Sequence, residues 1–518
     1  MANKSVFASI TGRLLPKATA TNVHGAPAYA YSDAHALAQV AVTGTFGGMF
    51  YQSPSEELEY VLEVADAVDP VFLAQAAIYA RQSGYMKDMP AVLLAVLARR
   101  DPVLFRAVFG RVVDNGKMLR TFVQVVRSGQ TGRKSLGSAP KAMVQNWLNT
   151  ASDWALLNAN IGNDPSLADV IKMVHPKPAN AAREALFAWV VRRPCDLARL
   201  PQGVQDWLVF KETGTGPLPD VPFQMLTQLE LSSDHWAQLA RKGSWQMVRQ
   251  SLNTFQRHGV FERAENVDHV AALLRNRDAI AKARAFPYQL MVAAQNVVAD
   301  MPRQIVDALH EAMEIAVQNV PGVAGQVVVC PDVSGSMTWS VTGYRPGATS
   351  AVRHVDVAAL VAASFLRVNR GCQVLPFDFD VRDVRLEPRD TILTNAERLA
   401  ALGGGGTNCS APLVWLNKQG RAPDLVVFVS DNQSWVDTHA GGRGTAMLKE
   451  WEKLKRRNPK AKLVCIDIAP YGTTQAQTRA DVLNIGGFSD AVFDQIAAFA
   501  AGRTGPDHWV GEIGKIDV

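Results

Sequence analysis

Side chains with oxygen atoms occur in three short segments, each of which we expect to lie at the end of a strand. The first segment is DVSGS at 332–336, directly after VVVCP, where alternate residues can turn a carboxylate and two hydroxyls toward one point. The second is a threonine after the glycines 403–406, which permit close backbone approach and positive φ, and the third is the aspartate of FVSDN. Hard cations such as Mg²⁺ prefer oxygen ligands. We therefore predict a divalent cation site, with Mg²⁺ as the expected ion. Its predicted ligands are Asp332, Ser334, Ser336, Thr407 and Asp431.

Other interpretations of these segments exist. Ser334 and Ser336 could cap a helix while the aspartates close loops, as happens at many strand ends. The glycine run lacks the Lys-Ser/Thr of a phosphate-binding P-loop, and no nucleophile with a neighbouring base is evident, so we expect no enzyme. Asp378 and Asp380 in FDFDV could approach the cation, but we expect these alternating strand-end carboxylates to be solvated.

The segments that carry these residues alternate between strand and helix patterns from about residue 320 onward. VVVC, QVLPFDF, DLVVFVSD and KLVCIDI predict strands, and VDVAALVAASFLRV, NAERLAAL and TAMLKEWEKLKRR predict helices. This rhythm is typical of a doubly wound, Rossmann-like parallel sheet, in which ligands bind at the carboxyl ends of the strands. The connection TWSVTGYRPGATSAVR at 338–353 is longer than usual. It could fold over the cation, carry partner specificity with Arg345 and Arg353 favouring an anionic ligand, or be a disordered insertion.

The preceding part of the chain, from about 30 to 320, is helical in pattern. Segments such as SEELEYVLEVADAV, PVFLAQAAIYARQSG and PAVLLAVLARRDP place apolar residues three and four apart, separated by short Pro, Gly or Asp punctuation. No strict internal repeat is present, so we predict a degenerate HEAT-like array of stacked helical hairpins. A chain of 518 residues exceeds a single core of roughly 250–300 residues. We expect a helical domain over 1–320 and an α/β domain over 323–518.

Basic residues cluster in the helical part. The stretch from Lys117 to Thr150 contains no acidic residue, although the whole chain has a formal net charge of only +5. Such patches attract phosphates by electrostatics and counterion release, whereas many basic runs are only solvated helix faces. Trp147 and Trp245 could stack bases, but their helical positions favour the core. The candidate RNA-binding residues are Lys117, Arg120, Arg133, Lys134, Lys141, Lys172, His175, Lys177 and Arg249.

Targeting and redox signals are weak in this sequence. The N-terminal stretch MANKSVFASITGRLLPKATATN has no sustained apolar region, and no apolar run approaches the ~18 residues of a membrane span. The cysteines lack CxxC or Cys/His metal spacing, so we expect neither disulfides nor a zinc site. These features predict a cytoplasmic protein.

Several motifs together resemble the Ro autoantigen, or TROVE-domain, family in its bacterial form. They are GTFGGMFY near residue 44, HPKP at 175–178, ARAFPYQLMVA at 283, DVSGSM at 332, GGGGTNCSAPLVW at 403 and VFVSDNQSW at 427. The resemblance extends over nearly the whole chain. In one segment the chain departs from the family, because NANIGNDPSLADV stands where relatives usually carry K-Y-x-x-R-x-G-W.

The resemblance implies a TROVE ring of HEAT-like repeats closed by a von Willebrand factor A-type domain with a metal-ion-dependent adhesion site. It implies binding of small noncoding Y RNAs on the outer ring surface and of single-stranded ends of misfolded RNAs in the central hole. Lys141, His175 and Arg249 match family positions linked to RNA contact. An exoribonuclease partner and a monomeric state are also expected.

From these observations we predict a noncatalytic, RNA-binding ribonucleoprotein scaffold that acts in RNA quality control or processing. The alternative, from another functional class, is a cation-dependent protein-interaction module on a helical scaffold, in which nucleic acid is incidental.

Overall fold

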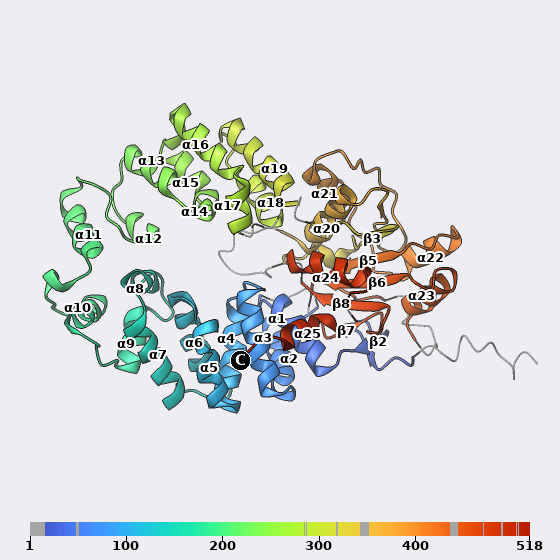
Figure 1. Cartoon of the computed structure of the whole chain (residues 1–518), viewed down its shortest axis with the longest axis horizontal. Coiled ribbons are helices and arrows are strands. Elements are labelled where there is room, and N and C mark those ends of the chain that lie inside the picture. The colour runs from blue at the N-terminus through green and yellow to red at the C-terminus, as the bar shows by residue number, and fades with distance from the viewer. Residues whose placement is uncertain are drawn as a thin grey trace, which may run out of the picture. The chain divides into compact units, whose positions relative to one another are not determined.

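The computed structural model of the chain forms two compact units (Figure 1). It describes residues 16–47, 51–283, 285, 287–317, 320–341, 352–435, 444–469, 471–487, 490–503, 505 and 507–518. We call the first unit the sheet unit; it comprises the described residues of Met1–Val61, Leu274–Asn296 and Val306–Glu512. The second, the helical unit, comprises Leu62–Leu273, Val297–Ile305 and Ile513–Val518. The expected boundary near residue 320 therefore does not coincide with the division by contacts.

A five-stranded parallel sheet with the order β4-β3-β5-β6-β8 forms the centre of the sheet unit. Its strands are β3 (Val327–Pro331), β4 (Gln373–Val374), β5 (Leu425–Ser430), β6 (Lys462–Asp467) and β8 (Val482–Gly486). The strands predicted from VVVC, DLVVFVSD and KLVCIDI are confirmed. The strand predicted from QVLPFDF is confirmed only at its first residues, and β8 was not predicted.

Helices cover both faces of this sheet, which explains its continuous apolar strands (Figure 1). On one face, alternate residues such as Val328, Val426 and Leu463 pack with side chains of α22 and α23, including the fully buried Trp451. Helix α20 packs against β3 and β5 and is buried along most of its length. The helices after β3 are α20 (His354–Val368), α21 (Ile392–Ala400), α22 (Ala411–Lys418), α23 (Ala446–Arg457), α24 (Asp490–Ala500) and α25 (His508–Gly514).

The N-terminal segment belongs to the sheet unit because its strands pair there. Strand β2 (Pro27–Ala30) pairs antiparallel with β1 (Ala20–Thr21) and with β7 (Thr473–Thr474). Helix α1 (Asp33–Thr43) packs on β8, and Tyr29 is fully buried in the core of the sheet unit. A pairing between residues more than 400 positions apart leaves no local pattern, which is why a boundary drawn along the sequence misses it.

In the helical unit, helices that follow one another in the chain pack together, for example α3 with α4 and α4 with α5. Asp-Pro pairs start two of its helices: the Asp69 side chain accepts a hydrogen bond from the Val71 N–H, and Asp101 accepts from the N–H of Val103. Its helices begin within α2 (Pro54–Ala67) and continue as α3 (Pro70–Gln82), α4 (Asp88–Arg100), α5 (Pro102–Val112), α6 (Gly116–Arg127), α7 (Ser138–Thr150), α8 (Asp153–Ala159), α9 (Leu167–Val174), α10 (Ala181–Val190), α11 (Gln202–Thr213), α12 (Phe223–Leu226), α13 (Ser233–Lys242), α14 (Trp245–Gln250), α15 (Leu252–Arg257) and α16 (Ala264–Leu274). In the described part of the chain, no helix has the length and apolar character needed to span a membrane.

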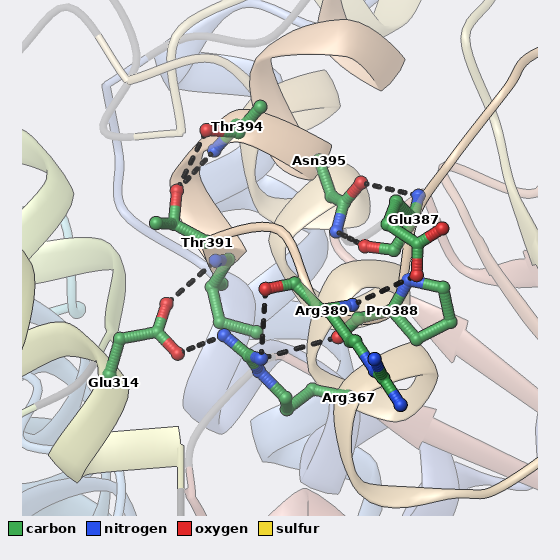
Figure 2. Close-up of polar contacts among 9 residues, drawn as sticks. Glu314, Arg367, Glu387, Pro388, Arg389, Thr391, Thr394 and Asn395 are labelled. Carbon is green, nitrogen blue, oxygen red and sulfur yellow. Dashed lines mark hydrogen bonds and ion pairs between the residues drawn. The ribbon is translucent and has the colours of Figure 1, made fainter.

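Helices α17 (Arg277–Ala283), α18 (Pro287–Asn296) and most of α19 (Arg303–Val317) lead into the sheet unit. Figure 2 shows how Glu314 of α19 is held there. Its carboxylate pairs with Arg367 of α20 and accepts a hydrogen bond of 2.8 Å from the Ile392 N–H in the first turn of α21. A carboxylate at this position also interacts favourably with the positive end of the α21 dipole.

Replacing Glu314 with alanine tests the importance of this contact. Glu314 and Arg367 each expose only 30% of their side chains, so the variant leaves a half-buried guanidinium without its carboxylate. We expect Glu314→Ala to lower the free energy of unfolding by about 1–3 kcal/mol in urea denaturation. The control is Glu311→Ala, one turn away, whose 56% exposed side chain pairs with Arg275 and should contribute less than about 1 kcal/mol. Equal losses for the two variants would contradict this account.

Candidate functional site

The five predicted cation ligands lie together at the carboxyl ends of β3 and β5. The Thr407 hydroxyl donates to Ser334 Oγ at 2.9 Å, and Ser334 Oγ lies 3.3 Å from Ser336 Oγ. Asp332 Oδ1 accepts a 2.8 Å hydrogen bond from the Ser334 N–H, and the Ser336 side chain hydrogen-bonds Asp431. None of the five residues is more than 4% exposed.

Parallel pairing and glycine together bring these segments to one point. The register of β3 and β5 sets Pro331 opposite Val429, so both strands end side by side. The glycine loop is then hydrogen-bonded to the first segment, because the Gly335 N–H donates to the Gly405 carbonyl at 2.8 Å. A Cβ on Gly405 would lie 2.3 Å from Asp378 Oδ2, so no other residue fits at this position without rearrangement.

The electrostatics of the site fit a bound cation. Burial raises the pKa of Asp332 to about 7, and the neighbouring charge of Asp431 adds to this effect. Burial also raises the pKa of Asp431 to about 6. Within the described residues, these carboxylates contact hydroxyls and backbone N–H groups rather than cationic side chains. Two buried carboxylates without a positive partner are unfavourable, and a divalent ion would offset their charge.

The composition of the ligand set also bears on which ions it suits. Among the described residues, no group of three or more His, Cys, Asp or Glu side chains could hold a metal ion. A cation at the end of β3 would therefore be held partly by hydroxyls and waters, which are ligands that Mg²⁺ accepts readily.

Two further aspartates lie near this centre. Asp467 ends β6 and is fully buried, and burial raises its pKa well above the usual range. Sequence reasoning missed it, although it follows the predicted strand KLVCIDI just as Asp431 follows its strand. The expectation of solvated carboxylates in FDFDV is wrong for Asp378, which is fully buried, and holds for the exposed Asp380. The chain turns back after β4, so that Arg382 Nε donates to Asp378 Oδ1 at 2.8 Å.

The N-terminal segment covers the candidate metal centre. Tyr51 shares a side-chain hydrogen bond with Ser336, and burial beside the charge of Asp431 raises the pKa of Tyr51. Its ring lies edge-on to His24 and to Tyr471, with centroids 5.1 and 5.7 Å away. No local signal marks this role, because the tyrosine lies far from the ligand segments in the sequence.

The long connection after the first ligand segment is described only at its ends. Residues 342–351, including Arg345, lie outside the described residues. Arg353 pairs with Asp356 at 2.7 Å in the first turn of α20.

The nine predicted RNA-binding residues all lie in the helical unit. Lys117, Lys134, Lys172, His175 and Lys177 are exposed, whereas Arg120, Arg133, Lys141 and Arg249 are half-buried. Arg120 has an evident structural role, since its guanidinium donates to the carbonyls of Ile161 and Asn163. The expectation that Trp245 belongs to the core is confirmed by its 4% exposure, and the Arg249 guanidinium lies 5.7 Å from its ring centroid.

Packing of α7 against α9 brings Lys141, the predicted RNA-binding residue of α7, close to those at the end of α9. Gln145 of α7 donates to the Val174 carbonyl at 2.6 Å, and Asn149 donates to the Lys177 carbonyl at 2.9 Å. A cavity of about 320 Å³ between these helices is lined by Lys141 and Arg127. Arg249 lies on α14, outside this pair of helices.

Replacing Asp332 with asparagine tests the electrostatics of the metal centre. The pKa of Asp332 is raised in the folded state, so the folded protein binds more protons than the unfolded chain and its stability falls as pH rises toward about 7. In EDTA, we expect the wild type to lose roughly 1–4 kcal/mol relative to Asp332→Asn between about pH 5 and about pH 8. Adding Mg²⁺ at the higher pH should restore the wild type and leave the variant unchanged. Parallel pH profiles in urea denaturation would argue against this charge arrangement.

Comparisons with known proteins agree with the fold. Residues 326–500 match the model of the Ro60 vWA domain. The chain is 25% identical to the RNA-binding protein RO60 of Deinococcus radiodurans, over 93% of this chain and 95% of that protein. It is 22% identical to the RNA-binding protein RO60 of Caenorhabditis elegans, over 46% of this chain and 37% of that protein. The crystal structure of the Deinococcus radiodurans RO (RSR) protein superposes with a TM-score of 0.60 at 21% identity, covering 91% of this chain and all of that chain.

These findings confirm the predicted fold class, a helical region joined to a von Willebrand factor A-type domain, while closure of the helices into a ring stays a prediction. The resemblance seen in the motifs is confirmed as well: the chain is similar to RO60 proteins over most of its length, and residues 326–500 match the Ro60 vWA domain.

Proposed function

We propose that this protein is a noncatalytic RNA-binding scaffold that binds RNA through the basic surface of α7 and α9. The observation that carries the proposal is the packing of these helices, which gathers Lys141, His175 and Lys177 on neighbouring elements. A relative that aligns with 93% of the chain is named an RNA-binding protein, which supports the same conclusion.

The chemistry of the surface favours RNA as its ligand. Lysine and arginine side chains neutralise phosphates and release counterions, and the gain does not depend on base sequence. RNA also offers unpaired segments and 2′-hydroxyls that a helical protein surface can reach, unlike the bases of a duplex. We propose small, Y-like noncoding RNAs and the single-stranded ends of structured or misfolded RNAs as ligands, in cytoplasmic RNA quality control with an exoribonuclease partner.

We further propose that a divalent cation, Mg²⁺ by its chemistry, binds at Asp332, Ser334, Ser336, Thr407 and Asp431. When bound, the ion supplies positive charge to two buried carboxylates and leaves room for water or a partner's oxygen. Tyr51 excludes solvent from the Ser336 side of this centre, and the Ser430 hydroxyl orients Asp332 by donating to its Oδ2 at 2.6 Å. The proposed role is therefore structural, because the ion ties the ends of β3 and β5 to the loops around them.

Removing basic side chains from the helical unit tests the RNA proposal. Lys141→Ala, His175→Ala and Arg249→Ala, combined in one variant, should weaken binding of a single-stranded RNA by about tenfold or more and flatten the salt dependence by roughly 0.7 in slope per lost phosphate contact. The control combines Lys418→Ala, Lys449→Ala and Lys460→Ala, three exposed residues of the sheet unit. Gel-shift affinity is measured at low and high salt, and an unchanged triple variant would refute RNA binding by this surface.

A second candidate function is a cation-dependent protein-interaction module on a helical scaffold. The observation that favours it is an exposed aromatic pair beside the glycine loop, Phe379 and Trp435, whose ring centroids lie 5.5 Å apart. Their exposures are 49% and 37%. If this function dominates, Asp332→Ala should abolish EDTA-sensitive binding of a protein partner, and the basic triple variant should bind that partner normally.

A further inference from the structure

A pocket of about 800 Å³ lies in the helical unit. It is lined by the loop 160–166, by α9, by the end of α10 and by residues of α11 and α12. The loop belongs to the NANIGNDPSLADV segment, where the sequence departs from the pattern of Ro relatives. A volume of this order suits a small organic ligand or one unit of a polymer.

One wall of the pocket is aromatic and rigid. Trp189 and Trp207 line it with ring centroids 6.5 Å apart and planes at 82°. The Trp207 indole N–H donates to the Met225 carbonyl at 3.1 Å, which fixes the ring. Trp189 packs edge-on against this ring and is half-buried, so part of its indole offers aromatic surface to a nucleobase.

Three basic residues also line the pocket. Lys172, Arg192 and Lys211 line the same pocket, and Lys211 Nζ lies 5.0 Å from the Trp207 ring centroid. The carboxylate of Asp169 is engaged by Ser166, whose hydroxyl and N–H donate to it at 2.6 and 3.0 Å. Cations beside an aromatic wall match a ligand that combines a base with a phosphate.

The backbone at Arg192 points to a requirement for its side chain. Arg192 follows α10 with φ of 60°, in the left-handed region that favours glycine at helix ends. The turn is closed by a 2.8 Å hydrogen bond from the Arg193 N–H to the Ala188 carbonyl. A strained residue is retained when its side chain is needed, and this one lines the pocket.

The loop that lines the pocket is held by a half-buried guanidinium. Arg120 donates to the carbonyls of Ile161, Asn163 and Pro165 and thereby fixes the loop. A Cβ on Gly162 would lie 3.0 Å from the Arg120 guanidinium, and Gly162 has φ of 100°, so the loop requires glycine there.

We propose that this pocket binds one unpaired nucleotide of an RNA strand, with the base against Trp189 and the phosphate between Arg192 and Lys211. The inference rests on the proposed RNA-binding function and adds a specific site to it. A base in a duplex is stacked and paired, so the pocket selects for single-stranded segments.

Arg192→Gly is the central test, because it separates binding from folding. The variant removes backbone strain, so it should unfold at the same or a higher temperature than the wild type. It should also bind a fluorescent twelve-nucleotide single-stranded RNA roughly tenfold more weakly in anisotropy titrations. Trp189→Leu should weaken binding to a similar extent. The matched control is Arg193→Ala, which removes a neighbouring exposed arginine that does not line the pocket and should leave affinity unchanged.

The outcomes distinguish failure of the nucleotide pocket from failure of the proposed RNA-binding function. If Arg192→Gly and Trp189→Leu bind the strand like the wild type while the Lys141, His175 and Arg249 variant loses binding, the pocket is refuted and RNA binding stands. If the latter variant also binds normally, the proposed function fails. Adenosine monophosphate that binds as tightly as the strand would make this a free-nucleotide site and overturn the assignment. Equal loss of affinity for a blunt duplex would overturn it as well.

Discussion

Charge buried at the ends of two strands is the constraint on which the sheet unit depends. Asp332 and Asp431 are almost fully enclosed, and burial shifts both pKa values upward. Carboxylates removed from water need compensation, and here it comes from hydroxyls, backbone N–H groups and, in our proposal, a divalent ion. Three features surround these carboxylates: the glycine loop before Thr407, the turn that contains Ser336, and the side chain of Tyr51, which hydrogen-bonds Ser336.

In the helical unit, two of the candidate ligand-binding residues lie just beyond the ends of helices. His175 and Arg192 both occupy left-handed positions just beyond α9 and α10, with φ of 48° and 60°. Glycine or asparagine is the usual choice there, so a basic residue at each place indicates that the side chain contributes more than a relaxed backbone would. Arg120 acts instead as an internal tie for the 160–166 loop. Some basic residues of the helical unit thus stabilise the fold, whereas others belong to a candidate ligand-binding surface.

Local pattern was sufficient where one physical rule dominated. The strands β3, β5 and β6 were predictable because a strand covered on both faces must be continuously apolar. Helices α2, α3 and α4 followed from apolar spacing and, for α3, from the Asp-Pro start. Strand β4 is only two residues long, so its backbone pairing leaves little trace in the sequence.

The sequence alone determined which residues could hold a cation, because each candidate ligand sits in order at the end of an apolar strand or glycine run. Only the tertiary structure decided what surrounds them: Tyr51 over Ser336, Asp467 beside Asp431, and Arg382 paired with Asp378. It also decided that the N-terminal strands join the sheet unit through β7. The physical reason is the same in each case. Side-chain types and hydrophobic periodicity can be read from residues that are close together in the sequence. Burial, strand pairing and charge compensation arise instead from contacts between residues far apart in the chain.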